Sequence, residues 1–327
     1  MSVNHCLIIW KLTHTFKTMS FLEQERALFD LLFDQSLREN FCKNSTTAFA
    51  GYELDDHELN DFKEIRPDAI ELDASMRTYL ILTQICRQFP VTFSLVSSLQ
   101  NGTNILKDLI NLQTMRYHPA ERATAFGSQL REQLSAQRPD TEFESEKEQS
   151  IITAILEAEL GMAWTGATLK IQVLAGETPS EGVVQSCIDW LDKPVKLAAY
   201  VSAAIIPQSY VKLKKTLCPC EDTALWAYLS KKPLSATLRK KTLANEEPKL
   251  FITRAHASTL SHCDPTVDHQ TVELSDGFAP LFQHVNGSMS IAQILAHLRQ
   301  AGAPEEILSG VEAGFHQLLT NGMFEFA

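Results

Sequence analysis

The residues that most resemble metal ligands in this sequence are cysteines and histidines in its last third. Cys218 and Cys220 form a Cys-Pro-Cys pair. Further candidates follow at irregular intervals, namely His256, His262, Cys263 and His269. A structural zinc site needs four ligands that close a tetrahedron, and its usual signature is two pairs of the Cys-x-x-Cys type. Because that regularity is missing, we interpret these residues as core and surface residues. A metal-dependent enzyme using Cys218, Cys220, His262 and Cys263 stays open as an alternative.

Motifs of the common catalytic classes are missing from the sequence. It contains no glycine-rich phosphate loop, no His-Glu-x-x-His pair and no Gly-x-Ser-x-Gly turn. His57 lies beside Asp55, Asp56 and Glu58, but an acidic, solvated helix start explains the same residues. The sequence offers no coherent nucleophile, so we expect that the chain is not an enzyme by itself.

The composition is that of a soluble globular protein of about two domains. The chain has 327 residues, of which 44% are hydrophobic and 21% charged, and a domain takes roughly 150 residues. Its net charge of −11 argues against sequence-independent binding of nucleic acid, because neutralising phosphates needs clustered Lys and Arg. One basic stretch suits a solvated face or an acidic partner or peptide. It consists of Lys212, Lys214, Lys215, Lys231, Lys232, Arg239, Lys240 and Lys241.

Seven cysteines, an odd number, are scattered along the chain. A protein of this size does not need disulfide bonds for stability, so we expect a reducing, cytoplasmic location. Residues 1–18 are mildly apolar but carry Lys11, His14 and Lys17. We expect them to be a non-native or flexible extension, with Met19 as the native start. No later run reaches 18 apolar residues, so no membrane span is expected.

Helical periodicity dominates residues 19–243, which we expect to form a helical body. Apolar residues recur at helical spacing from Phe21 toward Glu39, and again over 68–88, where Phe89-Pro90 ends the helix. Asp55 is expected to cap a short helix over 56–65. Further helices are expected over 91–98, 105–112, 120–134, 151–161, 183–191 and 196–206. The charged stretch 138–149 suits an exposed connection and is a candidate boundary between two helical subdomains.

The character of the sequence changes near residue 243, and residues 244–327 are expected to form a separate domain. Alternating apolar and polar residues over 249–254 and 270–274 predict two short strands. Three helices should follow, the first opened by Asp276, the second capped by Ser290 and the third begun near Pro304. Strands with three helices are typical of a winged-helix domain. The expected fold class is therefore mainly α, with a helical body and a C-terminal α+β winged-helix-like domain.

A winged-helix domain can hold an extended peptide as an added strand beside an apolar helix. The expected peptide-binding residues are Gln270, Thr271, Val272 and Glu273 on the strand and Val311, Phe315 and Leu319 on the third helix, although the helix positions equally suit the domain's own core. DNA is a poorer ligand, because the third helix carries Glu305, Glu306 and Glu312 but no Lys or Arg to reach phosphates. A winged-helix transcriptional regulator is kept as an alternative.

Three segments of the C-terminal region resemble the PqqD-like peptide-recognition domain of ribosomal peptide biosynthesis, also called a RiPP recognition element. They are Leu274-Ser-Asp-Gly-Phe-Ala-Pro-Leu-Phe, Val285-Asn-Gly-Ser-Met-Ser-Ile-Ala-Gln-Ile-Leu, and Gly322-Met-Phe-Glu-Phe after the third helix. The resemblance covers about a quarter of the chain. It implies that this domain holds a leader peptide while a second active site modifies the peptide.

The helical body contains the segment Met76-Arg-Thr-Tyr-Leu-Ile-Leu-Thr-Gln-Ile-Cys-Arg-Gln-Phe-Pro, followed by Phe93-Ser-Leu-Val. This segment and the overall layout are similar to the TglI-like partner proteins of multinuclear non-heme iron oxidases, and more distantly to the MbnC-type partners. The resemblance implies a heterodimer in which the iron belongs to a TglH-like oxidase with a TIM barrel and this chain holds no cofactor. The complex would act on a cysteine of a precursor or carrier peptide, in 3-thiaglutamate-like biosynthesis.

Overall fold

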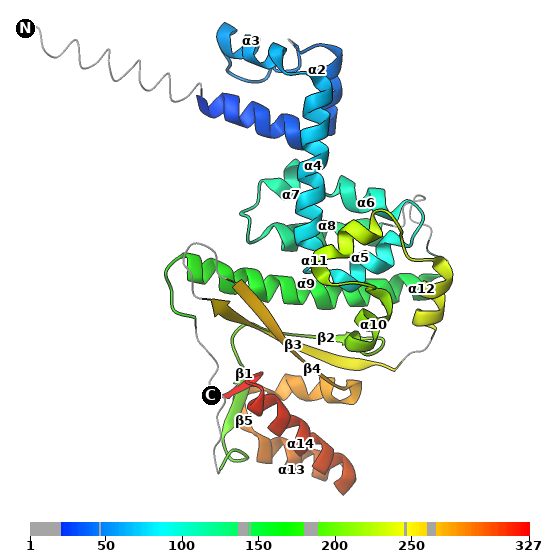
Figure 1. The fold of residues 1–327 in the computed structure, drawn as a ribbon. Coiled ribbons are helices and arrows are strands. Elements are labelled where there is room, and N and C mark those ends of the chain that lie inside the picture. The colour runs from blue at the N-terminus through cyan, green and yellow to red at the C-terminus, as the bar shows by residue number, and fades with distance from the viewer. Residues whose placement is uncertain are drawn as a thin grey trace, which may run out of the picture. The chain divides into compact units, whose positions relative to one another are not determined.

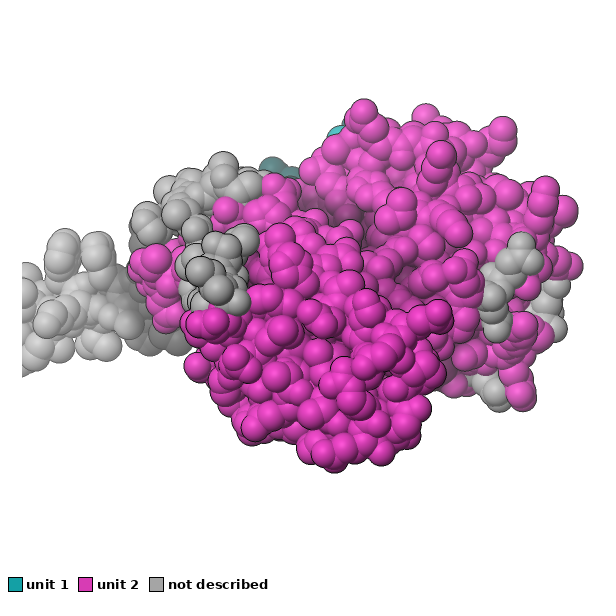
Figure 2. Space-filling view, turned by 90° about the horizontal axis from the view of Figure 1, so that it is seen from below, with its two compact units in different colours: residues 1–82, 107–117 teal, residues 83–106, 118–327 magenta. Residues whose placement is uncertain are grey.

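The computed structural model describes residues 21–45, 47–136, 143, 145–179, 189–244, 247–259 and 266–327 (Figure 1). The fold is mainly helical, with two small three-stranded antiparallel sheets in its C-terminal part, which confirms the expected fold class at that level. The chain divides into two compact units. Unit 1 is residues 1–82 with 107–117, and unit 2 is residues 83–106 with 118–327 (Figure 2). The boundary that we expected near residue 243 therefore falls inside unit 2.

Unit 1 is built from short helices around a small aromatic core. Residues 21–33 are helical, and α2 (Gln35–Lys43), α3 (Asp56–Glu64), α7 (Leu112–Met115) and most of α4 (Pro67–Cys86) also belong to it. Phe41, Phe49 and Phe62 are buried, and the ring centroids of Phe49 and Phe62 lie 4.4 Å apart. Asp55 caps α3 in a capping box with Glu58, as predicted.

The helical layer of unit 2 surrounds α5 (Pro90–Ser97), in which every residue is buried. That burial explains why its sequence has no polar face. The remaining helices of this layer are α6 (Gly102–Asp108), which begins in unit 2, α8 (Arg122–Ser135), α9 (Glu146–Leu174), α10 (Tyr210–Leu217), α11 (Asp222–Leu229) and α12 (Ala236–Leu243). Phe93 of α5 contacts Phe126 and Trp226, so α5, α8 and α11 share one aromatic cluster.

The larger sheet of unit 2, which we call sheet B, has the strand order β2-β3-β4. Its strands are β2 (Val201–Ile206), β3 (Lys249–Thr259) and β4 (Thr266–Ser275), all antiparallel. Helix α9 lies against one face, and the C-terminal helices lie below the other (Figure 1). Side chains alternate between these faces, so Phe251 contacts Tyr210 of α10 while Leu250 and Ile252 enter the C-terminal core.

The helix predicted over 196–206 is wrong, because this segment forms a strand end, a turn and β2. Tyr200 has a φ of 59°, which a helix interior does not allow. The β-branched residues Val201, Ile205 and Ile206 pair with β3, where such side chains are favoured. The predicted helix over 183–191 lies mostly outside the described residues.

The smaller sheet, sheet A, has the order β5-β1-β6. We call this sheet, together with residues 276–327, the C-terminal module. The strands of sheet A are β1 (Pro194–Leu197), β5 (Asn286–Ser290) and β6 (Phe324–Phe326), accompanied by α13 (Ile291–Gln300) and α14 (Glu305–Thr320). The helix opened by Asp276 is a 3-10 helix, η1 (Asp276–His284), with Pro280 inside it. Pro280 has no N–H, so this position contributes no backbone donor to the helix. Ser290 caps α13 as predicted.

Candidate functional site

The predicted peptide-binding edge is strand β4, at the border of sheet B. Its residues pair only with β3 within the part of the chain that the structure describes, for example Gln270 with Arg254 and Glu273 with Phe251. A border strand presents backbone N–H and C=O groups on its outer side, and these groups are able to pair with a further strand. The backbone of 270–273 therefore has the geometry that strand addition requires.

Side-chain hydrogen bonds fix β4 to helices on both faces of the sheet. The Gln270 side-chain amide donates at 2.8 Å to Oδ1 of Asn321, the residue that follows α14. On the other face, Glu273 Oε1 accepts from the backbone N–H of Val211 at 3.1 Å, in the first turn of α10. The Glu273 carboxylate thus acts as a second N-terminal cap of α10, beside Ser209. Neither contact could be predicted from the sequence, because each joins residues more than 50 positions apart.

The three predicted residues of the third helix lie in the core of the C-terminal module. Val311, Phe315 and Leu319 are 8%, 0% and 3% exposed. The ring of Phe315 contacts those of Phe278 and Phe324, at centroid distances of 5.4 and 5.7 Å. Val272 of β4 enters the same cluster, so the structure brings the strand and helix residues together. A peptide could contact these three side chains only if the core opened, and the prediction that it does stays untested.

The exposed face of α14 is acidic and polar. It presents Glu305, Glu306, Glu312 and His316, and it also exposes Ile307. His316 contacts the ring of Trp190 at a centroid distance of 5.3 Å. A negatively charged helix face repels phosphates, which weighs against the alternative of a DNA-reading helix.

The cysteines and histidines considered as metal ligands do not gather. Cys218 lies 3.6 Å from the Ser94 hydroxyl, and burial raises the pKa of its thiol to about 12. His256 is exposed on β3, whereas a ring nitrogen of His269 lies 2.9 Å from the Met162 carbonyl oxygen. Among the described residues no three His, Cys, Asp or Glu side chains are placed to share a metal ion. His262 and Cys263 lie outside the described residues.

A fully buried carboxylate, Glu159 of α9, lies against the N-terminus of α5. Its two oxygens accept the backbone N–H groups of Val91 at 3.0 Å and Thr92 at 2.9 Å, and Oε1 also accepts the Tyr210 hydroxyl at 2.6 Å. Burial raises the pKa of Glu159, and these hydrogen bonds oppose the rise. Pro90 has no N–H to offer, so Glu159 satisfies the first free donors of α5. We interpret it as a cap supplied by another helix, not as a catalytic acid.

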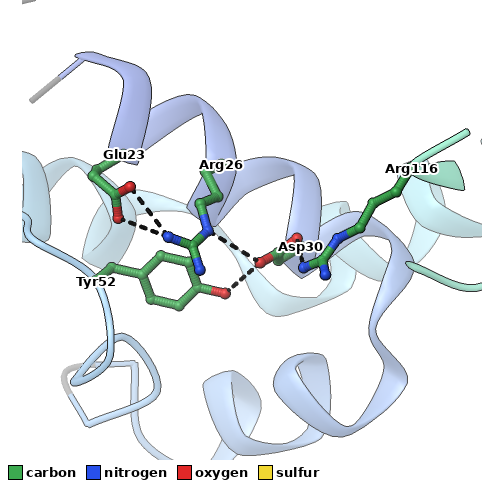
Figure 3. Close-up of polar contacts among 5 residues, drawn as sticks. All are labelled: Glu23, Arg26, Asp30, Tyr52 and Arg116. Atoms are coloured by element: carbon green, nitrogen blue, oxygen red, sulfur yellow. Dashed lines mark hydrogen bonds and ion pairs between the residues drawn. The ribbon is translucent and has the colours of Figure 1, made fainter. Parts of the chain in front are cut away.

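A second buried carboxylate, Asp30, lies in unit 1 (Figure 3). The Tyr52 hydroxyl donates to Asp30 Oδ2 at 2.8 Å, and Arg116 Nη2 lies 3.5 Å from Oδ1. Arg26 Nε lies 4.0 Å from Oδ2 and also pairs with Glu23. Burial raises the pKa of Tyr52 to about 12, so the phenol stays protonated at a higher pH than a free tyrosine does. This network joins three segments of unit 1, which is a structural role.

An apolar stripe runs along the part of α4 that lies in unit 1. Leu72, Met76, Tyr79 and Leu80 are between 41% and 62% exposed. They follow the i, i+4, i+7, i+8 spacing of one helix face. Nearby charges on α4 are paired within the chain, as in Asp73 with Arg77. Contiguous exposed apolar side chains of this size are typical of interaction surfaces.

None of the described helices combines the length and the apolar character that crossing a membrane requires. Comparisons of the chain with protein-family models, with curated proteins and with solved structures find no match.

Proposed function

We propose that this chain is a non-catalytic partner subunit that binds an extended precursor or carrier peptide and presents its cysteine to an iron-dependent oxidase. The observation that carries the proposal is the outer edge of β4, held by side-chain contacts to α10 and α14. An edge that its neighbours hold in place loses little entropy when a peptide adds to it. Main-chain hydrogen bonds would supply the affinity, and side chains next to the edge the specificity.

The layout of the C-terminal module supports peptide recognition. We assign to η1, β5, α13, α14 and β6 a winged-helix-like arrangement, in which β1 completes the sheet. The residues that resemble a PqqD-like domain fall on these elements and on the end of β4. The acidic face of α14 supports a peptide ligand over DNA.

The apolar stripe of α4 is the surface that we propose for docking the oxidase. It coincides with the start of the Met76 segment that resembles the oxidase partner proteins. Burying four large apolar side chains would drive association, at roughly 25 cal/mol for each Å² removed from water. In this proposal the iron belongs to the oxidase, and the product is 3-thiaglutamate-like. The four cysteines whose state the structure describes are free thiols, which supports a reducing compartment, inferred here to be the cytoplasm.

Strand addition is tested with Thr271→Lys, which places a flexible charge on the exposed edge of β4. The matched control is Ala203→Lys on β2, the opposite edge of the same sheet. The probe is a fluorescein-labelled peptide selected on the unchanged chain from a displayed library of random 12-residue peptides, and its binding is measured by anisotropy. We expect at least tenfold weaker binding for Thr271→Lys and no change for Ala203→Lys. Equal affinity of both variants with the unchanged chain would rule out this edge.

Docking is tested by co-purifying the chain with the protein encoded beside it and measuring iron in each component and in the complex. Iron confined to the partner, with a stable complex, supports the proposal. The double variant Met76→Asp with Leu80→Asp should abolish co-purification, whereas Ile307→Asp, an equally exposed apolar site in the other unit, should not. Stoichiometric metal in this chain alone would instead favour the enzyme alternative.

A further inference from the structure

The edge of sheet B opposite β4 is strand β2. Within the described part of the chain, β2 pairs only with β3. Its sequence, Val-Ser-Ala-Ala-Ile-Ile, contains no charged residue and no proline. Exposed edge strands ordinarily carry such residues, which prevent pairing with another chain. Strand β2 lacks this protection, and the side chain of its Ile205 is 53% exposed.

The hydrogen-bonding pattern of β2 shows which of its backbone groups point away from the sheet. The N–H of Ala255 donates to the carbonyl oxygen of Tyr200 at 3.0 Å, so these residues form a hydrogen-bonded pair. Such pairs alternate with non-hydrogen-bonded pairs along an antiparallel ladder, and the register of β2 with β3 is unbroken along the whole strand. The N–H and C=O groups of Val201, Ala203 and Ile205 therefore point outward.

These outward groups match those of a second β2 that is related to the first by a two-fold axis at Ala203. In that register Ala203 faces Ala203 of a second copy, and Val201 faces Ile205 on each side of the axis. Each pair then places outward N–H groups against outward C=O groups. Valine and isoleucine pack well against cross-strand neighbours, and the central alanines let the two strands approach. The edge is thus complementary to itself, as a two-fold interface requires.

Helix α9 supplies a large apolar side chain on the same side of the sheet. Successive helix residues are turned by about 100°, so the strands that α9 contacts identify its sides. Gly166 lies against β4, and Gly161 lies against Ser202 of β2. Leu169, which packs against β3, lies between them in angle. Trp164 continues this rotation past the β2 side, toward the outside of the sheet, and its side chain is 64% exposed.

We infer that two copies of this chain associate through β2, paired antiparallel about a two-fold axis at Ala203, with Trp164 beside the new strand pair. Sheet B then continues through both copies as six strands. Two chains of net charge −11 repel each other least at an uncharged edge, and tryptophan is enriched among the residues that dominate binding energy. This interface is small compared with the about 1,200–2,000 Å² of stable complexes, so the dimer is reversible.

This inference goes beyond the proposed function and does not depend on it. Strand β4 lies at the opposite edge of the sheet, so pairing at β2 leaves the proposed peptide site accessible.

The test is sedimentation equilibrium of the full chain over a series of concentrations. The mass should rise from that of one chain, 36.6 kDa, toward twice that value. Ala203→Lys places two like charges opposite each other on the axis, and Ala203→Pro removes an N–H that only the second copy uses. Each should raise the dimer dissociation constant at least about tenfold. Trp164→Asp should raise it several-fold.

The matched controls are Thr271→Lys, at the opposite edge of sheet B, and Ile307→Asp, an exposed apolar site on α14. Both should dimerise like the unchanged chain. The lysine and aspartate variants should keep the thermal midpoint of the dilute chain, because every side chain that they alter is exposed.

Hydrogen exchange identifies the surface that pairs. The amides of Ala203 and Ile205 point outward, so they should exchange rapidly in the dilute chain and become protected as the dimer forms. The amides of Ser202 and Ala204 point toward β3 and should be protected at every concentration.

Three outcomes would overturn the inference. A chain that stays monomeric at every concentration has no such interface, and a dimer that Ala203→Lys leaves unchanged, or in which the Ala203 amide stays unprotected, uses another surface. After either result, the proposed function still stands if Thr271→Lys weakens binding of the selected peptide. If Ala203→Lys abolishes peptide binding to a monomeric chain and Thr271→Lys does not, β2 is the peptide site and both proposals are wrong.

Discussion

Each compact unit contains a buried carboxylate that accepts a tyrosine hydroxyl, and the two units stabilise these carboxylates by different means. Asp30 in unit 1 is held by a tyrosine and by two arginines whose side chains are 56% and 61% exposed. Glu159 in unit 2 is held by a tyrosine and by two backbone N–H groups at a helix N-terminus. The first arrangement relies on solvated charges and the second on fixed dipoles in a dry interior. We therefore expect Glu159 to contribute more to stability and to respond less to salt.

The largest effect is expected from Glu159→Ala. This change leaves two backbone donors and the Tyr210 hydroxyl without their acceptor, and each unsatisfied buried group costs about 1–3 kcal/mol. We expect a loss of at least about 3 kcal/mol in the free energy of unfolding, measured by urea denaturation. The control is Glu157→Ala on the same helix, whose half-exposed pair with Arg131 should contribute less than about 1 kcal/mol. Similar losses for both variants would contradict the capping role of Glu159.

Tyr210→Phe should have the next largest effect. It removes the hydroxyl that donates to Glu159 at 2.6 Å but keeps the ring against Phe251. A hydrogen bond to a charged group contributes about 1.5–3 kcal/mol. The matched change in unit 1, Tyr52→Phe, removes a hydroxyl from a more solvated carboxylate. It should therefore lower the free energy of unfolding, measured by urea denaturation, by less than Tyr210→Phe does. The reverse order would show that the comparison between the two carboxylates is wrong.

Asp30→Asn should lower the free energy of unfolding of unit 1 by about 1 kcal/mol. The amide still accepts one hydrogen bond but no longer attracts the two arginines. Native-state hydrogen exchange should show faster exchange of amides in residues 21–33 and 47–55. Amides of α5 and α9 should exchange as before. Asp61→Asn, an exposed position in the same unit, serves as the control and should change neither group of amides.

The pKa of Tyr52 gives a pH test of the unit 1 network. Its folded pKa of about 12 lies above the ordinary value of 10 because burial and the Asp30 carboxylate disfavour the phenolate. The folded chain thus keeps a proton that the unfolded chain loses, so this contribution to stability is complete below pH 10 and is lost as the pH rises toward 12. Tyr52→Phe should remove that part of the alkaline loss of stability. Urea denaturation at pH values between 9 and 12 measures it.

The smallest effect is expected from salt. Raising sodium chloride to 1 M should screen the exposed arginines around Asp30 and speed hydrogen exchange in residues 21–33 only slightly. The amides of Val91 and Thr92, which donate to Glu159, should not respond. Equal salt sensitivity in both places would mean that Glu159 is more solvated than its burial indicates.

The sequence predicted the elements whose signals are local. Asp55 and Ser290 carry their own capping chemistry, and both cap the helices expected of them. The fully buried α5 was also predicted as a helix, because the helical stripe resumes after it over 105–112. Alternating residues over 249–254 and 270–274 predicted strands that the structure extends to β3 and β4.

The contacts that define the candidate site depend on residues far apart in the sequence. Residues 196–206 satisfy helical spacing, and only pairing with β3 on one side of the turn and with β5 and β6 on the other makes them strands. Nothing local marks Glu159 as the cap of α5 or Glu273 as a cap of α10. Side-chain type and spacing therefore determined the caps of α3 and α13 and the acidic third helix, but they placed α9 only at 151–161 and did not predict α10, α11 and α12. Tertiary packing decided which strand has a free edge and which carboxylates are buried, because both depend on segments that only folding brings together.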